Sequence, residues 1–190
     1  MGENKKVITS EYGKAIKSWV IENLDFIKKQ PNSKPKGHEG IVLALRDIQS
    51  SHQKTILTEQ SFPYKELNYI EEELINKYKI PVKKYAYLGI MIAYMEEGYK
   101  CKWHTDTTDN QNEYTTRLNV LLSKPEKGGS PIIKKEDKDI TVPIKKYESW
   151  ICVAGKYEHS TVKTKGKTPR ILLSFGYDIP KVILEKLTYI

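Results

Sequence analysis

The second half of the chain is a succession of short segments rich in Tyr, Ile, Val and Thr, separated by turns that contain Gly or Pro. Segments of this composition, at this length and spacing, are typical of β-strands. We expect eight of them, over residues 84–95, 99–105, 114–123, 131–134, 139–143, 148–153, 159–164 and 169–178. Many short strands joined by such turns pack as a sandwich or a barrel, and this half is therefore predicted to be all β.

The first 80 residues have a different pattern. Apolar side chains recur at helical spacing over residues 12–27 and again over 67–78, where Pro81 is expected to end the helix. Between them, 41–45 (IVLAL) has the composition of a short buried strand. With 190 residues and no evident linker, we predict one domain over 1–190, in which mostly helical residues 1–80 support a β core over 84–178.

The net charge of +8 suggests a nucleic-acid partner, but the kinds of residue that carry the positive charge argue against one. The positive residues are 29 Lys, scattered along the chain, and only three Arg, at positions 46, 117 and 170. Proteins that bind nucleic acid usually contact phosphates and bases through the bidentate guanidinium of Arg as well as through Lys. The two Cys are too few for a disulfide framework, and neither a secretion signal nor a membrane-spanning apolar run is evident, so we expect a cytoplasmic protein with no membrane partner.

The residues with the clearest chemical meaning are His104 and Asp106. Residues i and i+2 of an extended segment point to the same side, so this imidazole and this carboxylate converge. His159 begins a later predicted strand, and Arg170 follows eleven residues after it. Two His and one carboxylate form the facial triad of non-haem Fe(II) oxygenases, whereas a single H-x-D is usually only a polar turn. An Arg in an otherwise apolar strand needs a partner, which a bound dicarboxylate would supply.

A Cys/His zinc site is a weaker interpretation of the same segment. Cys101 stands three residues before His104, but no second Cys lies close to it in the sequence. Structural zinc sites usually need several such ligands at short spacing. An isolated Cys is more typical of a small buried hydrophobe, and Cys101 is predicted to be one.

An ordered set of motifs extends the pattern around the two His and Asp106. IAYMEEGYKCKWHTD is followed by RLNVLLSKPEKGG, SWICVAGKYEHSTV and TPRILLSFGYD. Over residues 85–178 the chain resembles the Fe(II)/2-oxoglutarate-dependent dioxygenases, in particular their prolyl-hydroxylase-like or aspartyl/asparaginyl-hydroxylase-like branches. The resemblance implies a double-stranded β-helix, the jelly-roll or cupin-like fold, packed by the N-terminal helices.

The resemblance also implies roles for individual residues. His104, Asp106 and His159 would hold Fe(II), and Arg170 would bind the distal carboxylate of the cosubstrate 2-oxoglutarate. Tyr94 and Ser174 would support that cosubstrate, and Arg117 would contact either the cosubstrate or the substrate. The implied reaction uses O2, with ascorbate as a supporting reductant, and hydroxylates the substrate while succinate and CO2 are released.

The substrate class stays open at the level of sequence. An amino acid, a peptidyl side chain or a related small molecule is favoured. Nucleic acid ranks below these because Gly176 stands where the nucleic-acid-dealkylating branch carries a second Arg. The remaining alternative is a non-catalytic, cupin-like module whose metal, if any, is structural. The sequence predicts no oligomeric state.

Overall fold

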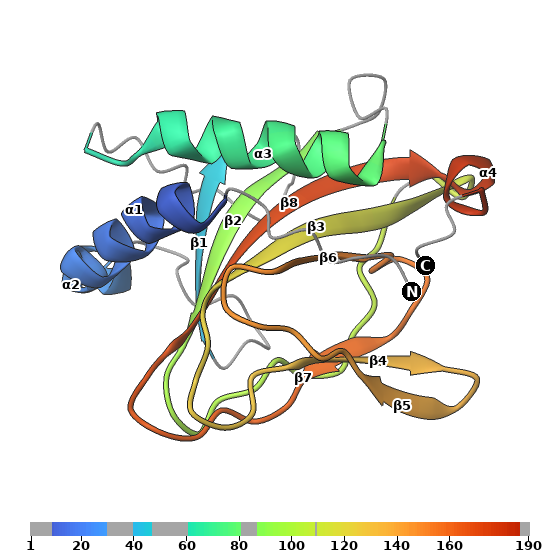
Figure 1. Ribbon diagram of the computed structural model, residues 1–190. Coiled ribbons are helices and arrows are strands. Elements are labelled where there is room, and N and C mark those ends of the chain that lie inside the picture. The colour runs from blue at the N-terminus through green and yellow to red at the C-terminus, as the bar shows by residue number, and fades with distance from the viewer. Residues whose placement is uncertain (1–8, 30–39, 47–60, 81–86, 109, 187–190) are drawn as a thin grey trace.

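Two antiparallel sheets and a layer of helices make up the computed structural model, which describes residues 9–29, 40–46, 61–80, 87–108 and 110–186. Figure 1 shows the helices across one side of the larger sheet and the smaller sheet on its other side. The predicted fold class, mainly β with flanking helices, is confirmed. No helix in these described ranges is long and apolar enough to cross a membrane.

The larger sheet has five strands in the order β1-β2-β8-β3-β6, and the smaller has three in the order β5-β4-β7. Their bounds are β1 Ile41–Arg46, β2 Tyr87–Met95, β3 Glu113–Ser123, β4 Pro131–Lys135, β5 Lys138–Thr141, β6 Ser149–Cys152, β7 His159–Thr161 and β8 Arg170–Pro180. The central strand β8 pairs with β2 on one side and β3 on the other, so residues distant in sequence become neighbours.

Side chains alternate between the two faces of this five-stranded sheet. One face, which we call the helix face, packs its apolar residues against the helices. It includes Ile90, Ile92 and Tyr94 of β2, Leu118 and Val120 of β3, and Ile171, Leu173 and Phe175 of β8. The opposite face, the arginine face, carries Arg117 and Asn119 of β3 beside Arg170 and Ser174 of β8. The sequence therefore divides each strand between packing and polar chemistry.

The N-terminal helical pattern is interrupted at one residue. α1 (Thr9–Glu22) and α2 (Leu24–Lys29) are separated by Asn23, whose side-chain amide donates to the carbonyl oxygen of Trp19 at 2.9 Å. Such local bonds compete with helix continuation. The third helix, α3 (Tyr64–Tyr78), ends at Lys79, which adopts a left-handed conformation with φ 51°. Pro81, predicted to end it, lies outside the described residues. A short α4 (Lys181–Leu184) follows β8.

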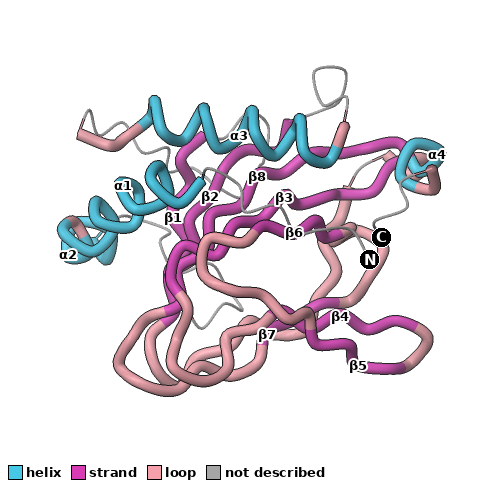
Figure 2. Tube along the Cα trace, viewed as in Figure 1, coloured by secondary structure: helices cyan, strands magenta, loops and turns pink. Residues whose placement is uncertain are grey.

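The strand predicted over 99–105 is wrong. Only an isolated bridge forms there, between His104 and His159, and Figure 2 shows loop along most of the path from β2 to β3. Threonine hydroxyl groups form hydrogen bonds with the backbone amides that would otherwise pair with a neighbouring strand. The Thr161 hydroxyl accepts from the amide of Cys101 at 2.8 Å, and the Thr164 hydroxyl accepts from the amide of Tyr99 at 3.1 Å. This loop is thus fixed to the segment around β7 without becoming a strand.

Candidate active site

Three side chains from separate segments meet on the arginine-face side of the larger sheet. His104 and Asp106 come from the loop after β2, and His159 begins β7. Their candidate ligand atoms all lie within 4.8 Å of one another. The bridge between His104 and His159 places the two residues side by side, because each backbone amide donates to the other residue's carbonyl oxygen at 3.2 and 2.9 Å. Two nitrogens and one carboxylate oxygen are a donor set that suits non-haem Fe(II).

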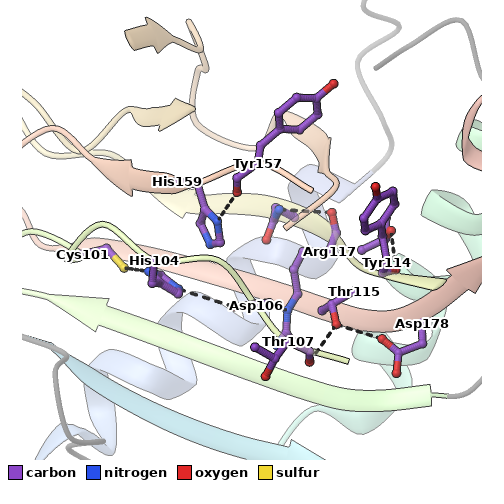
Figure 3. A network of polar contacts seen from close by, with 12 residues as sticks. Cys101, His104, Asp106, Thr107, Tyr114, Thr115, Arg117, Tyr157, His159 and Asp178 are labelled. Atoms are coloured by element: carbon purple, nitrogen blue, oxygen red, sulfur yellow. Dashed lines mark hydrogen bonds and ion pairs between the residues drawn. The ribbon is translucent and has the colours of Figure 1, made fainter. Parts of the chain in front are cut away.

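Backbone carbonyl groups orient both imidazoles. His104 Nδ1 lies 2.8 Å from the carbonyl oxygen of Lys102, and His159 Nδ1 lies 3.1 Å from that of Tyr157 (Figure 3). A carbonyl oxygen can only accept, so Nδ1 carries the proton in both rings. Each Nε2 is thereby left to ligate a metal, which is the usual arrangement of a metal-binding histidine.

Asp106 lies between an imidazole and a guanidinium. Its Oδ1 is 3.5 Å from His104 Nε2, and its Oδ2 accepts from Arg117 Nε at 3.0 Å. Burial disfavours its charge, but the hydrogen bond with His104 and the charge of Arg117 outweigh burial and hold the pKa of Asp106 well below its usual range. Asp106 is therefore ionised at neutral pH, as a metal ligand must be.

The two histidines differ in protonation when no metal is bound. The hydrogen bond with Asp106, followed by a contact with Cys101, raises the pKa of His104 to about 10. Burial, followed by the charge on His104, lowers the pKa of His159. In the metal-free protein one imidazolium thus neutralises Asp106, and the other ring stays neutral.

A hydroxyl network supports the loop that carries Asp106. The Thr115 hydroxyl lies 2.8 Å from Asp178 Oδ1 and 3.2 Å from the carbonyl oxygen of Thr107. The amide of Asp106 donates to Ala154 at 3.0 Å. Gly155 fits tightly here, since a Cβ at that position would lie 2.8 Å from the Thr115 nitrogen. These residues carried no signal in the sequence because their role depends on strand register.

Arg170 is a buried cation with no carboxylate in contact. Its side chain is 2% exposed, and its Nε donates to the carbonyl oxygen of Gly129 at 2.7 Å. No ion pair links it to any residue within the described ranges. Burial lowers its pKa to about 10, so it stays charged at neutral pH. An uncompensated buried charge is costly, which indicates that an anionic ligand completes this site.

The turn that faces Arg170 requires glycine. Gly129 has φ +70°, and a Cβ there would lie 2.6 Å from the Pro125 side chain and 3.3 Å from Arg170 Cδ. The KPEKGG turn can therefore bring a backbone carbonyl against the guanidinium only because this position has no side chain.

Ser174 adds an unused polar group on the same face. It is 1% exposed, and its Oγ has no hydrogen-bond partner among the described residues. Along β8 it shares this face with Arg170 and Leu172, and it lies directly opposite Asn119 of β3. Buried hydroxyl groups are normally satisfied. An orphaned hydroxyl on the same strand face as an unpaired guanidinium fits a polar ligand such as 2-oxoglutarate.

Tyr94 is not brought to this site. The register pairs Tyr94 with Ile171 and Met95 with Arg170, so the Tyr94 ring lies on the helix face, opposite the Arg170 side chain. The sequence motif predicted the correct strand, but the pairing register decides which of two adjacent residues faces the metal ligands. The structure therefore places Tyr94 on the other face of the sheet from Arg170 and Ser174, the residues expected to bind the cosubstrate.

Cys101, predicted to be a small buried hydrophobe, is half-buried and has a polar neighbour. Its Sγ is 3.7 Å from His104 Nδ1, on the side of the ring away from Nε2. Cys101 is not one of the three residues whose ligand atoms converge. This position gives no support to a Cys/His zinc site. The other two histidines, His38 and His52, lie outside the described residues.

Comparisons with known proteins give a consistent result at the level of the fold. No protein-family model and no curated protein matches the sequence. Among solved structures, a prolyl-4-hydroxylase from Pseudomonas putida is similar with a TM-score of 0.61 at 10% identity, over 93% of this chain and 90% of that one. A 2OG-Fe(II) oxygenase family member from Burkholderia pseudomallei is similar with a TM-score of 0.57 at 13% identity, over 90% of both chains.

A third similar structure is a prolyl hydroxylase from Trichoplax adhaerens, in complex with a peptide fragment of the hypoxia inducible factor oxygen degradation domain. Its TM-score is 0.61 at 13% identity, over 91% of this chain and 80% of that one. Identities this low establish the fold and leave the activity to be argued from the residues. The chain thus has the fold of the prolyl hydroxylases and other 2OG-Fe(II) oxygenases, which confirms at that level the family resemblance predicted from its sequence.

Proposed function

We propose that this chain is an Fe(II)- and 2-oxoglutarate-dependent oxygenase that hydroxylates an amino acid, a peptidyl side chain or a related small molecule, and releases succinate and CO2. We further propose that it acts as a single domain whose two sheets form a double-stranded β-helix. One observation carries the proposal. A convergent His104, Asp106 and His159 lies on the same side of the sheet as Arg170, a buried arginine that lacks a carboxylate.

The three converging residues would hold Fe(II), which, when bound with 2-oxoglutarate and O2, supplies the oxidising power for C–H hydroxylation. The protein's own part is to keep the ligand atoms in place. The carbonyl oxygens of Lys102 and Tyr157 fix the two imidazoles, and Arg117 takes one oxygen of Asp106, which leaves Oδ1 for the metal. Supports of this kind commonly change metal affinity 10- to 100-fold, by order of magnitude.

Arg170 and Ser174 would hold 2-oxoglutarate. A guanidinium can bind the distal carboxylate through two parallel hydrogen bonds, and Ser174 Oγ offers one further donor. The surrounding burial strengthens these bonds because little water competes for them. The peptide bound to the Trichoplax adhaerens enzyme supports a peptidyl or similarly small substrate for this chain, by analogy of fold.

The test is Fe(II)-dependent formation of succinate from 2-oxoglutarate in air, measured with and without ascorbate, across panels of amino acids, peptides and oligonucleotides. We expect succinate in the wild type, stimulated by a member of the first two panels, and none in His159→Ala. A protein that binds metal but forms no succinate with any panel would support the non-catalytic module instead. Stimulation by oligonucleotides alone would support oxidation of nucleic acid.

A further inference from the structure

Arg117 lies apart from the arginine assigned to 2-oxoglutarate. On the arginine face it is opposite Gly176, six residues along β8 from Arg170. At about 3.3 Å per residue, this separation is about 20 Å along the strand. The guanidinium groups of Arg117 and Arg170 therefore cannot bind the same carboxylate. In a chain with 29 Lys and three Arg, a second Arg on this face calls for its own explanation.

The Arg117 side chain is fixed in orientation but not satisfied. It is 20% exposed, and its Nε donates to Asp106 Oδ2 at 3.0 Å. A guanidinium has five N–H donors. Within the part of the chain that the structure describes, neither Nη nitrogen has a hydrogen-bond partner. Figure 3 shows the guanidinium extending from β3 toward the loop that carries Asp106. The Nη groups of Arg117 are thus hydrogen-bond donors without a partner in the described protein, on a side chain that is held beside Asp106, a candidate metal ligand.

The neighbouring strand positions do not supply an anion to these donors. Arg117 is flanked on the sheet by Gly176 of β8 and Cys152 of β6, and burial raises the pKa of the Cys152 thiol to about 12, so it stays neutral. Asp178 lies further along β8 and accepts from Thr115 at 2.8 Å, without an ion pair to Arg117. An acceptor for the Nη groups has to come from outside the described residues.

One lysine adds positive charge near the same loop. Lys156 lies over the ring of Tyr157 at 5.3 Å and forms no ion pair within the described ranges. Gly155, the residue before it, is close to this loop, since a Cβ there would lie 3.4 Å from the backbone carbonyl oxygen of Asp106. Tyr157, the residue after it, supplies the carbonyl that orients His159. The ammonium group of Lys156 would attract anions toward the region around Arg117.

We propose that Arg117 recognises the substrate, through a carboxylate that its Nη groups bind while Nε keeps Asp106 in place. This inference rests on the proposed function. A carboxylate suits the site because it can take two parallel hydrogen bonds from one guanidinium face. The required chemistry is a carboxylate near the carbon that reacts, either on a small free acid or on an acidic side chain of a peptide.

The test uses the protein loaded with Fe(II) and 2-oxoglutarate under anaerobic conditions, with binding measured by calorimetry. One probe set pairs each of the common amino acids with its α-amide. The other pairs end-blocked pentapeptides that contain Asp or Glu with the same peptides containing Asn or Gln. We expect at least one acid to bind about tenfold more tightly than its amide, the size of a charge-assisted hydrogen bond. The set in which it appears identifies the source of the carboxylate.

Arg117→Gln should remove this preference, whereas Lys138→Gln, which changes the charge equally on the exposed strand β5, should keep it. The proposal is overturned if no acid binds more tightly than its amide, if Arg117→Gln retains the preference, or if a thymidine oligonucleotide binds more tightly than every acid. Loading is checked first by the visible charge-transfer absorption of the Fe(II) and 2-oxoglutarate complex. Its absence contradicts the proposed function itself, whereas its presence without acid preference contradicts only the role of Arg117.

Discussion

The two faces of the five-stranded sheet are built from the same strands yet have opposite chemistry. On β8, Phe175 is fully buried against the helices, whereas its neighbour Ser174 carries a buried hydroxyl with no partner among the described residues. Ile171 and Arg170 show the same contrast at the start of the strand. The difference teaches that alternate residues of one strand serve stability and ligand binding separately. Substitutions on adjacent residues should therefore have separable effects.

The largest effect is expected for Asp106, the candidate metal ligand that accepts a hydrogen bond from Arg117. Asp106→Asn keeps a similar shape but removes the negative charge that faces the metal, so Fe(II) affinity should fall by more than about 100-fold, beyond what loss of a supporting residue costs. Calorimetric titration of Fe(II) under anaerobic conditions measures this. Unchanged affinity would mean that Asp106 is not a ligand.

The next effect belongs to the helix face. Phe175→Ala should lower the free energy of unfolding by about 3–5 kcal/mol, since it leaves a cavity between the sheet and the helices. Urea denaturation measures the change. If the variant is as stable as the wild type, the helix face is not the core of the protein.

Arg170→Met tests the arginine face on the same strand. Removing an unpaired buried charge should leave the stability of the ligand-free protein unchanged or raised, while 2-oxoglutarate affinity falls by about 10- to 100-fold. Denaturation and calorimetry on one preparation give both values. A large loss of stability together with unchanged 2-oxoglutarate affinity would assign Arg170 to the core instead.

Ser174→Ala should have the same pattern on a smaller scale. The hydroxyl makes no hydrogen bond within the described protein, so its removal should not destabilise the fold, and 2-oxoglutarate affinity should fall by about 2- to 10-fold. Leu173→Val, at the neighbouring residue, is a matched control. It should lower the free energy of unfolding but leave the affinity for 2-oxoglutarate unchanged. Equal affinities in wild type and Ser174→Ala would remove Ser174 from the cosubstrate site.

The smallest effect concerns pH. The pKa of His104 is raised from 6.5 to about 10 in the metal-free protein, so its stabilising effect is complete below pH 6.5 and is lost as the pH rises through 10. Metal binding needs the neutral ring, so uptake should release about one proton between these limits, and affinity should increase with pH. Calorimetry in two buffers of different ionisation enthalpy counts the protons. Release of none would contradict the protonated state of His104.

Much of this division could be predicted from the sequence. The alternation on β8 placed Arg170 and Ser174 together, and the spacing of His104 and Asp106 placed both on one side. The face on which Tyr94 lies could not be predicted, because it depends on register with another strand, which a single sequence does not reveal. The prediction of a strand over 99–105 was wrong because threonine hydroxyls accept hydrogen bonds from backbone amides of this segment. The contact of Arg117 with Asp106 joins residues on different elements, so it too required the structure.

The proposed function requires that the arginine face bind Fe(II) and 2-oxoglutarate together. Anaerobic titration of both into the purified wild-type protein tests it most directly, with the visible charge-transfer absorption of the chelated complex as the signal. We predict that the absorption appears only when both are present, saturates at one equivalent of each, and is weakened in Arg170→Met at the same 2-oxoglutarate concentration. A correctly folded wild-type protein that shows no such absorption at saturating Fe(II) and 2-oxoglutarate would contradict the proposed function.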